Sequence, residues 1–314
     1  MKKYIHALIT GSIAFDEIMD FNAPFQDYFH PEQLHQINVS FVVDNLKKQI
    51  GGTATNIAYS LSLLKCNNFH ILGSVGKDGN DIVHFFKKMK MNVDGIYIDK
   101  ELYTATGRVI TDINDNQIWG FYYGAGAKSS MIDPTKFIKN NSLFMISPNH
   151  ENGFLHFLRY AIEHNVDYIF DPGFTLTWIS DHDLRDGVAH ATYLIGNDYE
   201  IALICRRLNT TVEEYLKKGT IVITTLGDRG VTYEDSGKKI TVESYPVDKP
   251  IDPTGAGDAW RGGFMYGLLN DYNIHDSLIL GNVMASYSVE SYGTVNHTPQ
   301  KKDINKRIKL LKNR

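Results

Sequence analysis

The segment from Asp252 to Phe264 reads Asp-Pro-Thr-Gly-Ala-Gly-Asp-Ala-Trp-Arg-Gly-Gly-Phe and has the residue types of an anion-binding turn. Gly255 and Gly257 let the backbone approach a ligand closely, and a helical pattern begins at the same place. The first N–H groups of a helix lack partners within the helix, so such a turn attracts phosphate groups and other anions. The spacing therefore predicts a phosphate-binding turn around Gly255.

Asp258 lies in the first turn of that predicted helix. A carboxylate beside a phosphate repels it, so a turn that only bound phosphate would gain nothing from this residue. A general base does belong there, because it takes a proton from a hydroxyl group while the N–H groups stabilise the phosphoryl oxygens. The alternative is that Asp258 only stabilises the helix, since acidic residues are favourable in a first turn. Thr254 and the small Gly262-Gly263 pair in the same unit favour the catalytic interpretation.

The elements that position this turn alternate along the chain. Apolar runs typical of buried strands alternate with helical patterns, which predicts an α/β fold with a mainly parallel sheet between two helix layers. We predict strands at Tyr4–Thr10, His70–Val75, Leu143–Ser147, Tyr168–Phe170, Tyr193–Gly196 and Ile221–Thr225. We predict helices at Thr53–Leu64, Asp81–Met89, Glu151–Glu163, Tyr199–Arg206, Ala256–Leu269, Ser277–Tyr292 and from Lys301 to the end. No repeat or Pro/Ser-rich linker divides residues 1–314, so we expect one domain.

Two segments interrupt the alternation of strands and helices. Residues 14–48 are rich in aromatic side chains and include the stretch Ile37–Val43, in which apolar and polar residues alternate. Residues from about 100 to 125 predict a hairpin, Thr104–Asp112 and Gln117–Tyr123, around a turn-forming triplet at 114–116. We expect the two segments to form a small antiparallel sheet, a lid that excludes water from a reacting site.

Composition and charge exclude several classes of protein. The chain has 314 residues, of which 43% are hydrophobic and 22% charged, as in ordinary globular proteins. Its net charge of −4 and pI of about 6.3 give no basic field for nucleic acid or anionic lipid. No run approaches the ~20 apolar residues of a membrane span, and no signal peptide is recognisable. Two cysteines, Cys66 and Cys205, are too few for a disulfide framework, so we expect a cytoplasmic protein. From the charge and the lack of a membrane span, we expect no nucleic-acid or membrane partner.

The segment Asp252–Phe264 resembles the C-terminal signature of the ribokinase-like (PfkB) family of sugar and nucleoside kinases. The family's N-terminal signature has a match in Gly51–Ala58, followed by Gly76-Lys77-Asp78. Pro253 and Trp260 depart from the commonest residues of the pattern. The likeness is strongest to bacterial adenosine kinases, which the chain resembles at Thr10–Asp16, Pro31–His35, Val39–Phe41, Phe121–Tyr122, Gly124-Ala125 and Asn197–Glu200. The resemblance covers nearly the whole chain and implies a ribokinase-like three-layer sandwich with a small β lid.

The resemblance also implies roles for the residues that match the family's motifs. Asp258 would be the base that deprotonates a primary hydroxyl group, the 5′-hydroxyl if the acceptor is a nucleoside. Asp16 would accept hydrogen bonds from two vicinal ribose hydroxyls, since a carboxylate offers two acceptor oxygens. An anion hole for the transferred phosphate would be formed by Gly255, Ala256 and Gly257. The acceptor would also be contacted by Ser12, Gly52, Asn56 and Phe121.

On the donor side the resemblance implies ATP and Mg²⁺. Asn197 and Glu200 form the Asn-x-x-Glu pattern that would organise Mg²⁺ through water molecules, in keeping with the preference of Mg²⁺ for retaining its waters. Asp252 resembles the family residue near a monovalent-cation site, which makes potassium activation a hypothesis. The residues expected to bind the nucleotide are Asn197, Thr225, Gly227, Gly230 and Asn282.

The acceptor remains open at this point. The bacterial adenosine kinases that the chain resembles have a glutamine pair after an Asp-Pro that helps to recognise adenine, where this chain has Asp171-Pro172-Gly173 and then Phe174-Thr175. Gly107 also stands where an aromatic residue is usual. Adenosine is the leading acceptor, and another nucleoside or a sugar of the ribose or fructose type is the alternative. A non-catalytic regulator that binds a nucleotide or sugar is the rival from another class, and exposed lid edges make a homodimer an open alternative to a monomer.

Overall fold

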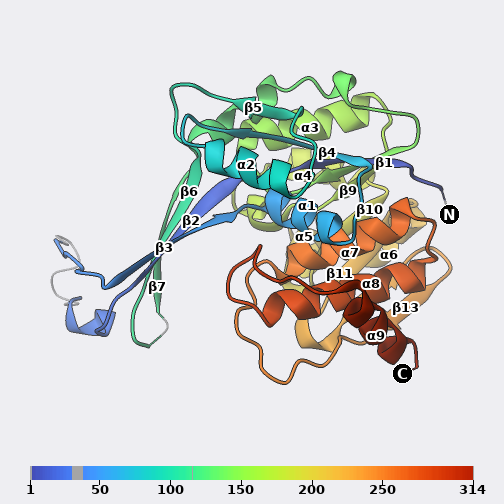
Figure 1. The fold of residues 1–314 in the computed structure, drawn as a ribbon. Coiled ribbons are helices and arrows are strands. Elements are labelled where there is room, and N and C mark those ends of the chain that lie inside the picture. The colour runs from blue at the N-terminus through green and yellow to red at the C-terminus, as the bar shows by residue number, and fades with distance from the viewer. Residues whose placement is uncertain (1, 30–37, 115, 314) are drawn as a thin grey trace.

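The computed structural model describes residues 2–29, 38–114 and 116–313. Its nine-stranded main sheet has the order β13-β12-β11-β10-β9-β8-β1-β4-β5 (Figure 1). The strands are β1 (His6–Thr10), β4 (Phe69–Val75), β5 (Ile96–Ile98), β8 (Ser142–Ile146), β9 (Tyr168–Phe170), β10 (Tyr193–Asn197), β11 (Ile221–Thr225), β12 (Val231–Glu234) and β13 (Lys239–Val242). The pairings from β5 to β11 are parallel, and β12 and β13 continue the sheet antiparallel.

Helices cover both faces of this sheet. They are α1 (Thr53–Leu63), α2 (Asn80–Lys88), α3 (Glu151–Glu163), α4 (Asp181–Ala189), α5 (Asp198–Leu208), α6 (Val212–Lys217), α7 (Ala256–Leu269), α8 (Ile274–Val289) and α9 (Lys301–Lys312). One hydrophobic core holds side chains of α1, α2, α7, α8 and α9, and the other holds those of α3 to α6. Successive strand residues enter different cores: Ile9 packs in the first and Leu8 in the second. This two-sided burial is typical of a parallel sheet, and it confirms the predicted three-layer α/β sandwich.

The strand order reverses at β1. The chain passes from β1 to β4 and β5 on one side, and later from β8 to β13 on the other. Open α/β sheets bind ligands where this reversal leaves a crevice beyond the carboxyl ends of the strands. The ends of β1 and β8 therefore mark the position where a site is expected, and the residues after Thr10 and Ile146 lie there.

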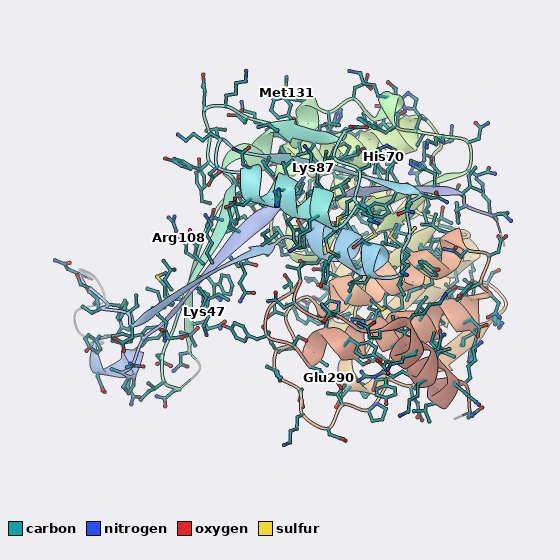
Figure 2. The ribbon with its side chains drawn as sticks, viewed as in Figure 1. Lys47, His70, Lys87, Arg108, Met131 and Glu290 are labelled. Atoms are coloured by element: carbon teal, nitrogen blue, oxygen red, sulfur yellow. The ribbon has the colours of Figure 1, made fainter. Side chains whose placement is uncertain are left out.

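A second sheet stands away from the body as a lid (Figure 1). It consists of β3 (Asn45–Gly51), β2 (Ala14–Asp20), β6 (Ala105–Thr111) and β7 (Gln117–Tyr122), in that order. Two of its pairings, β2 with β3 and β6 with β7, are antiparallel, and the central pairing of β2 with β6 is parallel. Lys47 and Arg108 lie along this arm (Figure 2), and the Nζ atom of Lys47 lies 4.8 Å from the centroid of the Tyr292 ring on the body.

Four predicted elements have the predicted bounds, most of the others differ by one to three residues at an end, and one stretch predicted as part of the small sheet is not a strand. Tyr168–Phe170, Ile221–Thr225, Glu151–Glu163 and Ala256–Leu269 have the predicted bounds. The alternating stretch Ile37–Val43 is not a strand where it is described, because the Phe41 ring packs among the rings of Phe21, Phe25, Tyr28 and Phe29 at the lid tip. Residues 30–37, which contain Pro31–His35, and Asp115 of the hairpin triplet lie outside the described residues.

The structure also describes the two cysteines and the apolar character of the helices. Cys66 is buried and Cys205 half-buried, and both are free thiols. In the part of the chain that the structure describes, no helix has both the length and the apolar character needed to cross a bilayer.

Candidate functional site

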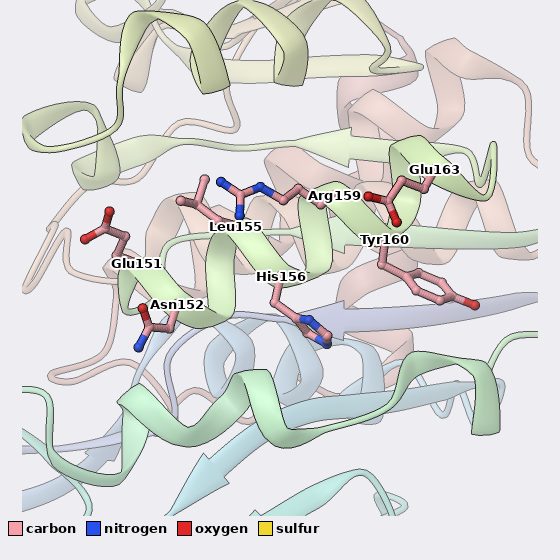
Figure 3. Close-up of a pocket in the computed structure, with 7 residues that line it drawn as sticks. All are labelled: Glu151, Asn152, Leu155, His156, Arg159, Tyr160 and Glu163. Carbon is pink, nitrogen blue, oxygen red and sulfur yellow. The ribbon is translucent and has the colours of Figure 1, made fainter.

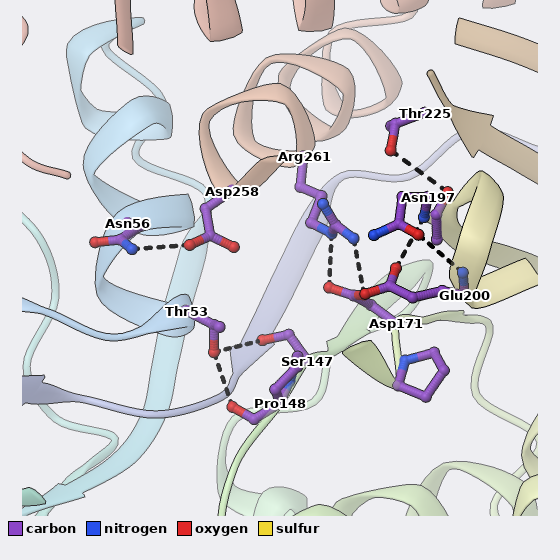
Figure 4. A network of polar contacts seen from close by, with 12 residues as sticks. Thr53, Asn56, Ser147, Pro148, Asp171, Asn197, Glu200, Thr225, Asp258 and Arg261 are labelled. Carbon is purple, nitrogen blue, oxygen red and sulfur yellow. Dashed lines mark hydrogen bonds and ion pairs between the residues drawn. The ribbon is translucent and has the colours of Figure 1, made fainter. Parts of the chain in front are cut away.

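The floor of the site joins three elements at the point where the sheet order reverses. The backbone N–H of Thr53, at the start of α1, donates to Ser12 Oγ at 3.0 Å. Thr53 Oγ1 donates to the carbonyl of Pro148 at 2.9 Å (Figure 4). Ser147 Oγ donates to the carbonyl of Thr10. The predicted acceptor residue Ser12 is thus buried and engaged in holding the start of α1 against the ends of β1 and β8.

Two of the predicted glycines are required by the backbone. Gly52 precedes α1 with φ +96°, and a Cβ atom there would lie 2.4 Å from the carbonyl oxygen of Ser12. Gly255 precedes α7 in the left-handed region with φ +75°, and its Cβ would lie 2.8 Å from the Thr294 side chain. Both positions need glycine for conformation and for close approach. They bring the starts of α1 and α7 to the same place.

Asp258 and Asn56 connect those two helix starts. Asn56, buried on α1, donates from Nδ2 to Asp258 Oδ2 at 2.8 Å (Figure 4). Burial raises the pKa of the Asp258 carboxyl, while the Arg261 guanidinium and the Asn56 hydrogen bond act to lower it. Gly257, one residue earlier, is exposed, so the first turn of α7 opens to solvent. A carboxylate fixed beside open helix N–H groups is the arrangement that proton transfer to a base beside a phosphoryl group requires.

Asp16 lies on the lid, in the second strand of the small sheet. In the sheet register it stands in one row with Gln49, Gly107 and Phe121. A Cβ on Gly107 would lie 3.1 Å from Asp16 Oδ1, 3.3 Å from the Trp119 ring and 3.5 Å from the Phe121 ring. Phe121 and Trp119 are 46% and 54% exposed, so two open aromatic rings flank this carboxylate.

The Asn-x-x-Glu pattern begins helix α5. Asn197 Oδ1 accepts the backbone N–H of Glu200 at 2.8 Å, and Glu200 Oε2 accepts the backbone N–H of Asn197 at 2.8 Å. This reciprocal capping box accounts for the pattern locally. Thr225, at the end of the neighbouring strand, donates to the Gly196 carbonyl at 3.4 Å, so the three predicted residues do lie together (Figure 4).

The other predicted donor residues differ in their surroundings. Gly227 has φ +62° and nothing within 4 Å of a Cβ position, so its backbone borders open space. Gly230 has φ +96°, and a Cβ atom there would lie 2.1 Å from the carbonyl oxygen of Val242, so both the conformation and the space require glycine. Asn282 is buried, accepts from Trp260 Nε1 at 2.9 Å, and donates to the carbonyls of Val242 and Glu243. Its amide therefore joins α7, α8 and the end of β13.

Asp252 holds the turn before α7 in place. Its Oδ1 accepts the backbone N–H of Thr254 at 2.9 Å, and its Oδ2 accepts that of Gly293 at 2.9 Å. Thr294, next in the chain, packs against Gly255 and donates weakly to the carbonyl of Ile50 at 3.4 Å. The turn at Gly255 is thus fixed to the segment that follows α8.

One buried ion pair beside the site was not predicted from the sequence. Arg261 on α7 is 7% exposed and meets Asp171, 2% exposed, through Nη2 to Oδ1 at 2.8 Å and Nε to Oδ2 at 2.6 Å (Figure 4). The only local signal is an arginine in a helix whose one other charged residue is Asp258, and it does not identify a partner ninety residues away.

Two surface hollows lie outside this site. No group of three or more His, Cys, Asp or Glu side chains suited to a metal occurs among the described residues. Two surface hollows of about 540 and 430 Å³ lie along α3 and its contact with α4, and the larger is lined by Glu151, Asn152, Leu155, His156, Arg159, Tyr160 and Glu163 (Figure 3). Neither contains a predicted site residue.

Comparisons with known proteins agree on the family. Residues 13–301 match the model of the pfkB family carbohydrate kinases. A nucleoside kinase of Methanocaldococcus jannaschii is 29% identical over 276 residues, which cover 87% of this chain and 90% of that protein. The structure of Burkholderia thailandensis nucleoside kinase in complex with inosine superposes with a TM-score of 0.86 at 28% identity, covering 98% of both chains. The ADP-inosine complex of the same enzyme gives a TM-score of 0.84 at 29% identity, covering 98% of this chain and 96% of that one.

Proposed function

The chain belongs to the pfkB family of carbohydrate kinases, and on that premise we propose that it transfers the γ-phosphoryl group of ATP to the 5′-hydroxyl of a nucleoside. Adenosine is our leading acceptor. The observation that carries the proposal is the position of Asp258, hydrogen-bonded to Asn56 at 2.8 Å in the open first turn of α7. The similarity to two nucleoside kinases over nearly their whole length supports a nucleoside as the class of acceptor.

In this mechanism Asp258 takes the proton of the attacking hydroxyl as its oxygen approaches phosphorus. The N–H groups of Gly255, Ala256 and Gly257 stabilise the negative charge on the transferring phosphoryl oxygens. Asn56 donates to one oxygen of Asp258 and leaves the other free to face the acceptor. Transfer is direct and in line, with no covalent enzyme intermediate.

The acceptor is held from the lid. The Asp16 carboxylate accepts hydrogen bonds from both vicinal ribose hydroxyls. The backbone of Gly52 and the side chain of the buried Asn56, at the start of α1, form the wall on the other side of the sugar. Ser12 supports this wall through its bond to Thr53. The open rings of Phe121 and Trp119 beside Asp16 favour a nucleoside over a simple sugar, because a base offers an aromatic face to stack and a sugar does not.

The donor lies over the ends of β10 and β11. Gly227, whose backbone borders open space, and Gly230 shape the turn that receives the nucleotide, and Thr225 lies at its entrance. Asn282 supports this region from below, since each of its amide groups is already bound to protein. Glu200 keeps one carboxylate oxygen outside its capping bond, which suits Mg²⁺ held mainly by phosphates and water. A magnesium ion held there would supply positive charge to offset that of the nucleotide phosphates.

A monovalent cation fits less simply. Both oxygens of Asp252 already accept backbone N–H groups, so the side chain acts first as the clamp of the Gly255 turn. A potassium ion beside Asp252 would need further oxygen ligands from the neighbouring backbone, and no step of the mechanism depends on it.

A panel of acceptors tests the proposed function. Purified protein is mixed with ATP, Mg²⁺ and, separately, adenosine, inosine, cytidine, ribose and fructose, and ADP release and the phosphorylated product are measured. We expect the highest kcat/KM with a purine nucleoside. Transfer only to ribose or fructose supports the sugar-kinase alternative, and binding without transfer to any acceptor supports the non-catalytic regulator.

The affinity for the acceptor is expected to depend on pH. Burial raises the pKa of Asp16 to about 6, and its protonation removes an acceptor for the ribose hydroxyls. The adenosine Kd, measured calorimetrically without ATP, should be constant above pH 7, rise as the pH falls through about 6, and level off at a value about 10- to 150-fold higher, the loss expected when the carboxylate charge is removed. Asp16→Asn, which has no such proton, should give a flat profile. A flat profile in the unmodified protein would rule out the ionised carboxylate as the ribose acceptor.

The lid also carries a surface suited to a second copy of the chain. On the face opposite Asp16, one register row crosses all four strands with Leu46, Met19, Ile110 and Ile118, and Leu46 is 62% exposed. We propose that two lids pair through this row, since an apolar face on an open sheet favours self-association. Light scattering after size exclusion should give a dimer mass, and Leu46→Lys combined with Ile118→Lys should give a monomer. A monomeric unmodified protein would exclude the pairing.

A further inference from the structure

The buried pair of Arg261 and Asp171 has no explanation in stability alone. Both side chains are more than nine-tenths buried, and taking two charges from water costs several kcal/mol that their attraction does not reliably recover. Well-packed apolar residues of similar volume often serve stability equally well. The pair therefore suggests a use for a positive charge at this position.

The guanidinium is directed at the phosphate-binding turn. Long side chains on a helix lie back over the preceding turn, and a Cβ on Gly257 would lie 2.9 Å from Arg261 Nη1. Nε and Nη2 face Asp171, whereas Nη1 has no hydrogen-bond or ion-pair partner among the described residues. A donor nitrogen of a buried arginine thus remains available next to the first turn of α7.

The guanidinium of Arg261 also lies beside the first turn of α7, at the positive end of the helix dipole. Cations near the N-terminus of a helix are unfavourable, because the helix dipole is positive there. Asp171 holds the guanidinium in spite of this, and Asp258 and Glu200 also interact with it electrostatically. Arg261 therefore places a charged hydrogen-bond donor beside a turn that already attracts anions, between Asp258 and the Asn197–Glu200 cap (Figure 4).

We propose that Arg261 is a catalytic residue whose Nη1 donates a hydrogen bond to an oxygen of the transferring γ-phosphoryl group. This rests on the proposed function. The bond from phosphorus to the β–γ bridging oxygen breaks, a bond from phosphorus to the acceptor oxygen forms, and the acceptor proton passes to Asp258. The guanidinium keeps its protons throughout, and Asp171 fixes its orientation.

The test variant removes both charges of the pair together. Arg261→Gln with Asp171→Asn leaves neither charge of the pair without its partner, so its melting temperature should stay close to that of the unmodified protein. Its kcat should fall by ~10²–10³-fold, as when one donor to a developing oxyanion is lost, with the adenosine Kd unchanged. The matched control is Arg307→Gln with Glu290→Gln, which removes a partly buried ion pair between α8 and α9 and should leave kcat unchanged.

Further measurements separate the possible outcomes. If Arg261 contacts the phosphoryl group directly, kcat of the double variant should be lower across the whole pH range. Recovery to the unmodified rate above pH 8 would mean that Arg261 only tunes the pKa of Asp258. The proposal would then be wrong. It would also be wrong if kcat stayed within threefold of the control. Contact with the γ-phosphoryl predicts weaker ATP binding but unchanged ADP binding in the double variant, which tests Arg261 without turnover. An unmodified protein that binds ATP but phosphorylates no acceptor overturns the proposed function, and equal ATP affinities overturn the role of Arg261.

Discussion

The Asp258→Asn variant is expected to keep the fold and the acceptor affinity but to lower kcat by ~10²–10⁴-fold. Asparagine has nearly the same shape and can still accept the hydrogen bond from Asn56, so the contact between α1 and α7 remains. It cannot take the proton of the attacking hydroxyl. Steady-state rates at saturating ATP and nucleoside, together with the adenosine Kd and the melting temperature, measure the effect.

Asp276→Asn is the matched control for this substitution. Asp276 occupies the third position of α8, as Asp258 does in α7, and it lies in a first turn capped by Asn273. If acidic residues at these positions only stabilise their helices, the two variants should lose similar stability and neither should change kcat. A nearly normal kcat in Asp258→Asn would remove the assignment of a general base.

The Asp16→Asn variant is expected to weaken nucleoside binding about 10- to 150-fold, the equivalent of ~1.5–3 kcal/mol for a hydrogen bond to a charged group. The amide keeps one acceptor oxygen and presents a donor where the second vicinal hydroxyl needs an acceptor. The effect should appear in the adenosine Kd and in kcat/KM, with a much smaller change in kcat. Isothermal calorimetry and initial rates measure the two quantities.

Glu17→Gln is the control within the same strand. Glu17 follows Asp16, so its side chain lies on the other face of the lid sheet, where it pairs with Arg108 at 2.7 Å. It should leave the adenosine Kd unchanged. A nucleoside without the 2′- and 3′-hydroxyls should bind Asp16→Asn and the unmodified protein equally, and a persistent difference would show that Asp16 acts on something other than the ribose.

The start of α7 was predictable because its information is local. A glycine turn followed by fourteen helical residues specifies both the helix and its open N-terminus, and the observed bounds equal the predicted ones. A short local pattern can also fit two different uses. Asn-x-x-Glu predicted a magnesium site, yet the pattern also satisfies a capping box, so four residues alone do not distinguish the two uses.

Other parts of the site depend on contacts that local patterns do not encode. Strand β3 carries Lys47 and Lys48 and has almost no buried side chains, so the usual alternation of apolar and polar residues is missing there. Arg261 and Asp171 belong to different halves of the fold, and only the packing of α7 over the sheet brings them together. Asn282 was expected beside the nucleotide, but its amide binds three protein groups that its own helix does not reveal.

The division of the chain into two sheets has a consequence for how such an enzyme changes over time. Asp16, Trp119 and Phe121 stand on the lid, whereas Asp258 and the Gly255 turn stand on the main body. Under the proposed function, substitutions in the hairpin of β6 and β7 would therefore change the lid side of the acceptor site without disturbing the groups proposed to move the phosphate. Under that proposal the lid contributes to acceptor choice together with Gly52 and Asn56 of the main body, and exchanging the lid between relatives is a route to altered specificity.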